Sequence, residues 1–472
     1  MAATYLYRNQ GTPTGDGKKA TISVWIKPSF MTYGSGTDGI FEVRNPGINA
    51  SFDLAIDNGK IWFAVLNASG WVGSLIPNFQ PRDWNSWMHI VCVYDSAQST
   101  DNQRMIMYIN GKDVRTDYGG YTTATYVAQD TVSTALAASS AYTQKWARYA
   151  DTSSYYFDGY MAQCIFVDGE AYQASTFGST DATTGEWKPK SDGEIRSAVT
   201  FGDQGSLLNF SNGSNLGYDY QTSGRSTTND FTVSGSGYKT LDNPSDNQPT
   251  LNQQVDKGGG IGYSFSNANQ GLSFSAGDWG LIPGTIGPGD SGKWYFEAKQ
   301  TSLTNYAQMG FLTAKNLNAG GWEGYFGQEG GNEPAYGYGQ DGKIYYSTTS
   351  ANTQSTSADW ATFTSGDICM CALDLDNNFI YFGKNGTWGN SGDPTSGSTG
   401  TGGYAIANPS GSLWLPAVAG YNCTWQMNFG AGYFDSSAVA SGNSDDGGLG
   451  TFEYDVPAGY RTICTKNIKT YG

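Results

Sequence analysis

The sequence predicts an all-β protein built from two antiparallel sandwiches in tandem. Residues 87–111 and 366–386 share one pattern: an alternating apolar strand that ends in Asp, a polar turn, and a second strand that closes on Asn-Gly. Asn-Gly is a strong hairpin signal because type I′ turns need positive φ at both central residues. The composition agrees, since 65 of the 472 residues are Gly, aromatic residues make up 14% and charged residues only 14%. Such a composition suits sheets joined by tight turns.

Alternating apolar residues predict the strands of the first half. The expected strands are 4–9, 20–28, 39–43, 51–56, 60–66, 87–94, 104–109, 143–149 and 155–167. Asp57-Asn58-Gly59 predicts a hairpin between two of them. Residues 117–141 are rich in Thr, Ala and Ser and are compatible with a short helix or an extended loop, and residues 171–190 with a loop that holds one helical turn.

The second half repeats the all-β pattern after a polar interval. Residues 237–260 hold two prolines and a Gly triplet, which predicts the linker, so we expect domains over 1–236 and 261–472. The clearest strands of the second domain are 293–299, 306–312, 335–339, 343–347, 367–375, 379–384, 413–419 and 423–430. Residues 386–412 and 435–450 are expected to be long loops.

Charge and cysteine content narrow the classes of partner. The net charge of −16 argues against a nucleic-acid partner, because such a partner selects for a basic face. No apolar run approaches ~18 residues, so membrane insertion is not expected. The N-terminus lacks a basic region followed by an apolar one, which predicts synthesis in the cytoplasm. The six cysteines lie mostly in apolar strands without C-x-x-C, and we expect them to be reduced core residues.

The second half resembles a SPRY (B30.2-like) domain, which is a concanavalin-like sandwich. The motifs that carry the resemblance are SGKWYFEAK at 291–299, MGF at 309–311, DGK at 341–343, the unit at 365–386, LPA at 415–417 and VPAGYRTICTKNI at 456–468. The first half resembles a laminin-G-like concanavalin-type jelly roll through TISVWIKPS at 21–29, the unit at 87–111 and YFDGYMAQCIFVDGEAY at 155–172.

The tandem of these modules is similar to virion proteins of tailed bacteriophages and marine viruses. That resemblance implies a tail-fibre-like appendage on the virion surface that recognises host-surface glycan or protein. It also implies contacts with other virion proteins and a homo-oligomer, with a trimer favoured. The first expected strand begins near residue 4, so attachment is expected to use a sandwich surface or a partner protein. The alternative is a capsid-decorating or adaptor protein whose faces bind other virion proteins.

The residues offer little for catalysis, and we do not expect an enzyme. His89 is the one histidine and lies in an alternating strand, so it is expected to be structural. A glycosidase needs two carboxylates across a cleft, and no strand carries alternating acidic residues. Glu323, Glu329 and Glu333 cluster in a Gly-rich loop, where hydration is the simpler explanation. A polysaccharide-degrading enzyme remains the least favoured alternative.

A bound Ca²⁺ is left open in the first half only. Laminin-G-like domains often hold calcium at a loop rim, but no EF-hand signature is present. Candidate ligands are Asp53, Asp57, Asp95, Asp101 and Asp158. Asp95 and Asp374 each end a strand before a turn, which is itself a structural reason for Asp.

Aromatic residues in the loops are the candidate ligand contacts, because sugars stack on rings and hydrogen-bond to neighbouring polar groups. The candidates are Trp71 and Trp84 in the first half, and Trp322, Glu323, Tyr325, Tyr336, Trp360 and Trp388 in the second. Trp residues inside strands are expected in the cores: Trp25, Trp62, Trp294 and Trp425.

Overall fold

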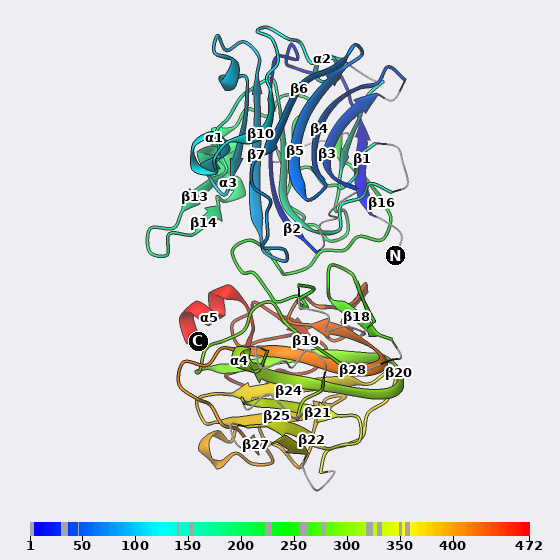
Figure 1. The fold of residues 1–472 in the computed structure, drawn as a ribbon, viewed down its shortest axis with the longest axis vertical. Helices are drawn as coiled ribbons and strands as arrows, with labels where there is room; N and C mark the ends of the chain where they lie inside the picture. The colour runs from blue at the N-terminus through cyan, green and yellow to red at the C-terminus, as the bar shows by residue number, and fades with distance from the viewer. Residues whose placement is uncertain are drawn as a thin grey trace. The chain divides into compact units, whose positions relative to one another are not determined.

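The chain forms two all-β units in a computed structural model. The model describes residues 4–29, 36–45, 47–138, 141–150, 154–221, 229–254, 262–275, 277, 279–317, 324–327, 333–348, 352–354 and 359–472. Contacts between Cα atoms divide the chain into Met1–Lys239 and Thr240–Gly472. The predicted fold class, an all-β chain with concanavalin-like antiparallel sheets in both halves, is confirmed (Figure 1).

The first unit is a sandwich of an eight-stranded and a six-stranded sheet. The larger sheet has the order β10 (Tyr121–Thr125), β6 (Gly70–Pro77), β5 (Lys60–Asn67), β4 (Ala50–Asp57), β3 (Thr37–Asn45), β11 (Thr143–Trp146), β1 (Tyr5–Asn9), β16 (Thr232–Ser234). The smaller sheet has the order β15 (Ser206–Leu208), β12 (Gly159–Asp168), β2 (Lys19–Pro28), β7 (Met88–Asp95), β8 (Met105–Ile109), β9 (Lys112–Asp113). The main core, which includes Ile22, Phe41 and Phe52, joins the two sheets.

A third layer covers the far side of the six-stranded sheet. A second core packs Val91 and Ile165 of this sheet against Phe177 and Ile195. The covering segment contains η2 (Ala174–Thr176), the hairpin of β13 (Gly178–Thr180) and β14 (Trp187–Pro189), and α3 (Asp192–Ala198) (Figure 1). The helical turn expected within 171–190 is present as η2, but the β13–β14 hairpin was not expected. The few apolar residues of this segment are enough to hold it on the sheet. The remaining short elements of this unit are η1 (Asp101–Gln103), α1 (Val114–Asp117) and α2 (Thr134–Ala137).

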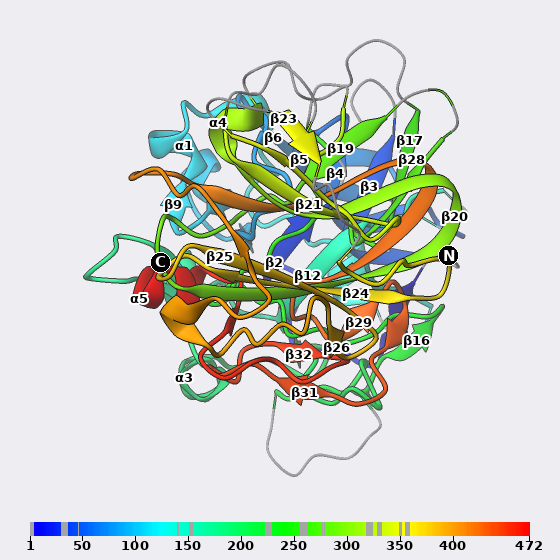
Figure 2. The same ribbon diagram turned by 90° about the horizontal axis from the view of Figure 1, so that it is seen from below.

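The second unit is organised around two long strands. β20 (Lys293–Thr313) and β28 (Trp414–Asn428) pair along most of their length and curve together (Figure 2). Each was predicted as two strands, and register shifts at Gln300/Ser302 and Leu303/Tyr306 mark the bulges where the alternation breaks. Their sheet also contains β17 (Tyr263–Ser266), β18 (Gly271–Phe274), β19 (Gly280–Pro283), β21 (Ala335–Gly339), β22 (Ile344–Ser347), β23 (Asn352–Gln354), β24 (Ile368–Asp374), β25 (Phe379–Lys384), β26 (Thr387–Trp388), β27 (Tyr404–Ala405) and β33 (Arg461–Thr462).

The remaining elements of the second unit are short. The C-terminal segment contains two-residue hairpin strands: β29 (Tyr433–Phe434), β30 (Ser437–Ala438), β31 (Asn443–Ser444) and β32 (Thr451–Phe452). The helical elements are α4 (Ala314–Leu317), η5 (Gly397–Thr399) and α5 (Thr465–Tyr471). The two loops predicted at 386–412 and 435–450 thus contain short strands. Packed side chains around Tyr295, Phe452 and Tyr460 attach the C-terminal segment to the sheet.

Part of the predicted linker belongs to the second unit. Leu251 is fully buried in the main core of that unit, and its N–H donates to the carbonyl of Asn269. The carbonyl of Asn247 accepts from the N–H of Thr465. Residues 255–260 lie outside the described residues. Prolines and glycines mark turns but do not report burial, and a single apolar side chain at 251 anchors the segment.

The repeated strand–turn–strand unit has one geometry in both halves. Asn110 and Gly111 have φ of 48° and 77°, and Asn385 and Gly386 have 49° and 80°. The Asn110 Oδ1 accepts from the N–H of His89 at 2.8 Å, and the Asn385 Oδ1 accepts from the N–H of Ile368 at 2.9 Å. The asparagine therefore tolerates the positive φ of the turn and also accepts a hydrogen bond from the start of the first strand of the unit.

We expect Asn385→Ala to cost more stability than Asn385→Gly. Alanine loses the acceptor and must also hold positive φ, at about 1 kcal/mol for the hydrogen bond and another 1–2 kcal/mol for the backbone. Both variants also lose the donation from Asn385 Nδ2 to Asp367 Oδ1 at 2.7 Å, but glycine adds no backbone cost. Urea unfolding of the two variants beside the wild type measures the difference, and equal costs would contradict the double role.

Candidate functional site

The side chains of the eight-stranded sheet that point away from the main core form the candidate site. Phe41 and Val43 of β3 and Phe52 of β4 are in the core. Because successive side chains on a strand point to opposite faces, Glu42 and Asp53 lie on the other face. We call this the outer face of the first unit.

A row of charged residues crosses the outer face. Lys145 of β11 pairs in register with Glu42, and Glu42 pairs with Asp53. The Lys145 Nζ lies 3.2 Å from Glu42 Oε2, and the Arg44 Nη1 lies 3.3 Å from Glu42 Oε1. The backbone N–H of Ala150 also donates to Glu42 Oε1 at 3.1 Å. The Glu42 carboxylate is thus held by two cations and one amide.

The two neighbouring carboxyl groups differ in their electrostatics. Burial raises the pKa of Asp53 well above its usual range, and the nearby Glu42 carboxylate adds to the rise. Burial also raises the pKa of Glu42, while Lys145 and Arg44 act to lower it. Asp53 is therefore the member of the pair that more readily keeps a proton. The Ser51 hydroxyl donates to Asp53 Oδ2 at 2.6 Å.

These carboxyl groups are not arranged for hydrolysis. Glu42 and Asp53 both have zero exposure, whereas a glycosidase must bring two carboxyl groups to the scissile bond. We interpret them as a structural support for the sheet. The pair was not predicted because its members stand on adjacent strands. A charged residue inside each of the apolar runs GIFEV and SFDLAI is the signal that could have shown it.

Four aromatic rings and Arg44 lie on the outer face together with this row of charged residues. The rings of Trp62 and Trp71 meet at 5.0 Å between centroids with an interplanar angle of 62°, and Tyr149 lies 5.7 Å from Trp62. Tyr155 lies 5.9 Å from Tyr149, and the Arg44 guanidinium lies 5.8 Å from the Tyr149 ring. We call these five residues the aromatic face.

Trp71 is the most accessible ring of the aromatic face. It is 51% exposed, whereas the other four residues are half-buried. The Trp62 Nε1 donates to the Ser74 Oγ at 3.0 Å, which fixes the indole against which Trp71 rests. A large exposed ring held by a fixed neighbour can stack on an apolar sugar face, while polar groups elsewhere on the face bind hydroxyls.

The other predicted contact residues lie in different surroundings. Trp84 is half-buried, and its Nε1 donates to the carbonyl of Pro81 at 3.3 Å. Tyr325 and Trp388 are also half-buried. Trp322 and Glu323 lie outside the described residues, as does Glu329, while Glu333 is half-buried.

Tyr336 and Trp360 were wrongly predicted as loop contacts. Both are in the main core of the second unit, with exposures of 2% and 5%. Tyr336 lies on β21, stacks near Trp414 and accepts with its hydroxyl from the N–H of Ala407. The prediction for Trp62 was also wrong in part, since it is half-buried on the outer face; Trp25, Trp294 and Trp425 are buried as expected.

His89 is buried and paired in a way that excludes a role as a base. The Trp187 Nε1 donates to the His89 Nδ1 at 3.0 Å, so the neutral ring carries its proton on Nε2, which lies 2.8 Å from Ser23 Oγ. Burial lowers the pKa of His89 to about 3. Nε2 therefore donates to the serine, and cannot accept its proton.

The calcium candidates have separate structural roles. The Asp95 carboxylate accepts from the N–H of Ala97 and from Gln98, as expected for turn chemistry. Asp57 accepts from Thr37, Asp101 accepts from the N–H of Asn102, and burial raises the pKa of Asp158. Within the described ranges, no three His, Cys, Asp or Glu side chains are grouped as a metal would need.

The structure also contains, in those ranges, no helix long and apolar enough to cross a membrane.

Comparisons with known proteins agree with the fold of the first unit. Residues 3–164 match the family model described as the concanavalin A-like lectin/glucanases superfamily, Laminin_G_3. No curated protein matches the sequence.

Solved structures give broad and distant matches. Domains LG4-5 of the mouse laminin α1 chain are 9% identical, with 93% of this chain and 89% of that chain covered and a TM-score of 0.30. A heptameric SAP-like pentraxin from Limulus polyphemus is 15% identical, with 44% and 86% covered and a TM-score of 0.29. The SPRY domain of human HERC1 is 17% identical, with 34% and 87% covered and a TM-score of 0.25.

Proposed function

We propose that this protein is a non-enzymatic binding protein that recognises carbohydrate through the aromatic face of its first unit. The observation that carries the proposal is Trp71, a half-exposed tryptophan that packs against Trp62 on the aromatic face. The match of residues 3–164 to a lectin and glucanase superfamily supports a sugar ligand. The buried state of Glu42 and Asp53 favours binding over hydrolysis.

The biological setting that we propose is the surface of a virion. The tandem of laminin-G-like and SPRY-like modules motivates a tail-fibre-like appendage, in which the chain binds host-surface glycan as a homo-oligomer, a trimer being favoured, beside other virion proteins. Recognition of a host-surface protein is the rival. Glu42 and Asp53 have zero exposure, Lys145 is 4% exposed, and Arg44 is paired with Glu42. The row of charged residues therefore makes no exposed acidic or basic patch. This favours a neutral sugar as the ligand.

Trp71→Ala should reduce adsorption of the purified full chain to permissive bacterial cells by at least tenfold. The expected loss corresponds to one stacking contact of about 1.5 kcal/mol. Leu413→Ala is the control, because Leu413 is 46% exposed and lies in the second unit. Adsorption is measured by sedimentation with labelled protein, before and after periodate oxidation of the cell-surface sugars.

The two arms separate the ligand classes. Adsorption that depends on Trp71 but survives periodate would favour a protein receptor. Adsorption that is equal for the wild type and Trp71→Ala would reject the aromatic face as the site.

A further inference from the structure

We propose that the second unit carries its own binding surface for neutral polysaccharide, on a ridge of aromatic rings. The ridge consists of Tyr421, Tyr306, Trp279, Tyr325 and Tyr345. This inference goes beyond the proposed function, which rests on the first unit alone.

The five rings form a continuous series. Centroids are separated by 6.4 Å between Tyr421 and Tyr306, 5.3 Å between Tyr306 and Trp279, and 4.9 Å between Trp279 and Tyr325. Tyr345 completes the series at 6.1 Å from Tyr325. The planes of the first three rings stay within 24° of parallel from one ring to the next. Steps of this size are comparable to one sugar ring, so a chain of sugars can contact successive rings.

The sheet holds the ridge on its side away from the main core. Met309 and Val418 point into the main core, whereas Leu312 and Ala419 belong to a smaller cluster on the opposite side. Trp279, Tyr325 and Tyr345 pack against this smaller cluster. Tyr306 is opposite Tyr421 in the β20–β28 register, directly after a bulge. The bulge lets Tyr306 remain 48% exposed while its strand stays paired.

Polar groups accompany the rings as sugar hydroxyls require. The Tyr345 hydroxyl donates to Asp341 Oδ2 at 2.9 Å, and the Asp341 side chain is 36% exposed. In the adjoining bulge, the Asn422 Nδ2 donates to the Asn305 Oδ1 at 3.0 Å. Rings next to carboxylate and amide groups are the combination that binds the apolar face and the hydroxyls of a sugar.

The charge of the ridge and of the whole chain favours a neutral polysaccharide over a polyanion as the occupant of the ridge. The Lys343 Nζ lies 4.0 Å from Asp341 Oδ2, so this pair has no net charge, while the whole chain carries −16. A polyanion is repelled by such a charge. A neutral polysaccharide is not.

Affinity electrophoresis of the full chain tests the ridge. Native gels containing dextran, mannan or laminarin should retard the wild type with at least one of the three. Tyr306→Ala should weaken that retardation at least fivefold. Tyr471→Ala is the matched control, because Tyr471 is 45% exposed in the same unit but lies outside the ridge, and it should migrate as the wild type does.

The outcomes distinguish the two surfaces. Weakening by Tyr306→Ala while Trp71→Ala has no effect supports the ridge and counts against the first-unit site. Weakening by Trp71→Ala alone overturns the ridge and keeps the proposed function. No retardation by any neutral polysaccharide, or retardation only by a polyanion such as alginate, also overturns the ridge.

Discussion

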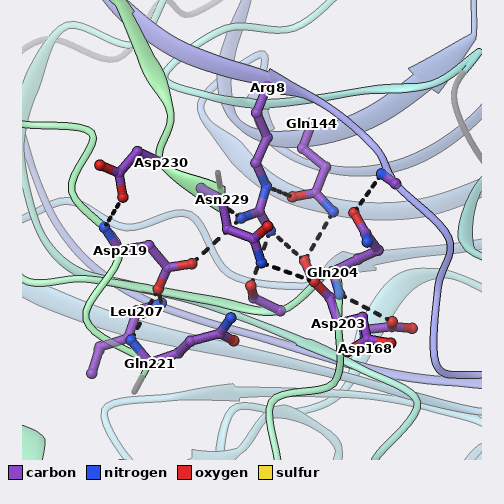
Figure 3. A network of polar contacts seen from close by, with 12 residues as sticks. Arg8, Gln144, Asp168, Asp203, Gln204, Leu207, Asp219, Gln221, Asn229 and Asp230 are labelled. Carbon is purple, nitrogen blue, oxygen red and sulfur yellow. Dashed lines mark hydrogen bonds and ion pairs between the residues drawn. The ribbon is translucent and has the colours of Figure 1, made fainter. Parts of the chain in front are cut away.

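Replacing Arg8 with Met should lower the free energy of unfolding of the first unit by about 3–5 kcal/mol. Arg8 is 8% exposed, and its guanidinium donates to five acceptors (Figure 3). Nε donates to Gln144 Oε1 at 2.8 Å, Nη1 to Asp219 Oδ2 and to the carbonyl of Asn229, and Nη2 to the carbonyls of Gln204 and Gly205. The Phe231 ring lies 4.4 Å from the guanidinium.

The large cost follows from what the substitution leaves behind. The Asp219 side chain has zero exposure and would lose its ion pair with Arg8. Its Oδ1 would still accept from the N–H groups of Leu207 and Gln221. Arg8 also joins the first strand to Gln204, Gly205 and Asn229, so the backbone around these residues should become more sensitive to protease.

The measurement is urea unfolding with hydrogen exchange followed on peptides of Met1–Lys239. Asp219→Asn in the Arg8→Met background should recover part of the loss, because it removes the buried charge that Arg8 neutralised. The control Arg115→Met breaks a more exposed pair with Asp113 and should cost no more than about 1 kcal/mol. A cost for Arg8→Met equal to that of the control would contradict the role of Arg8.

Glu297 should make the stability of the second unit depend on pH. Its carboxylate accepts from the N–H groups of Glu453 and Tyr454, each at 2.9 Å, from the Tyr295 hydroxyl and from Asn428. Burial raises the pKa of Glu297 from 4.5 to about 7, although these hydrogen bonds lower it. Because the folded pKa lies above the unfolded one, the folded state holds the proton more tightly, and stability is lost as the pH rises from 4.5 through 7.

The expected decrease is up to about 3 kcal/mol in the unfolding free energy of the second unit across that range. Glu297→Gln should abolish this pH dependence. It should also cost about 2–4 kcal/mol at low pH, since an amide turns its NH₂ toward two of the donors. Asp455→Asn, which changes an exposed carboxylate next to Tyr454, is the control and should leave the pH dependence intact. Urea unfolding at several pH values checks both statements.

The alternation of apolar residues predicted most strands of both units. It did not predict which side chains of a strand point away from the core. In KIWFAVL, Ile61, Trp62 and Phe63 are all apolar. Alternation of apolar and polar residues therefore could not show that Trp62 faces outward. The charge row was hidden for a related reason: Lys145, Glu42 and Asp53 become neighbours only through strand register. Lys145 and Glu42 are separated by 103 positions in the chain. Register follows from tertiary packing, and a single strand does not contain it.

The ridge of the second unit was hidden by the same effect. Tyr306 and Tyr421 are cross-strand partners in the long β20–β28 pair, and Trp279 and Tyr345 come from other strands or their flanks. Loop aromatics were the natural candidates from sequence, yet Tyr336 and Trp360 are buried. The exposed rings of Trp71 and Tyr306 each lie on a sheet face that points away from the main core of their unit.

The most direct test of the central claim is ¹⁹F NMR of the full chain labelled with 5-fluorotryptophan, titrated with polysaccharide purified from the surface of a permissive host. Trp71→Phe assigns the resonance of Trp71. The account predicts that the Trp71 resonance shifts on titration while that of the buried Trp146 stays in place. A bound polysaccharide that leaves the Trp71 resonance unchanged would contradict it.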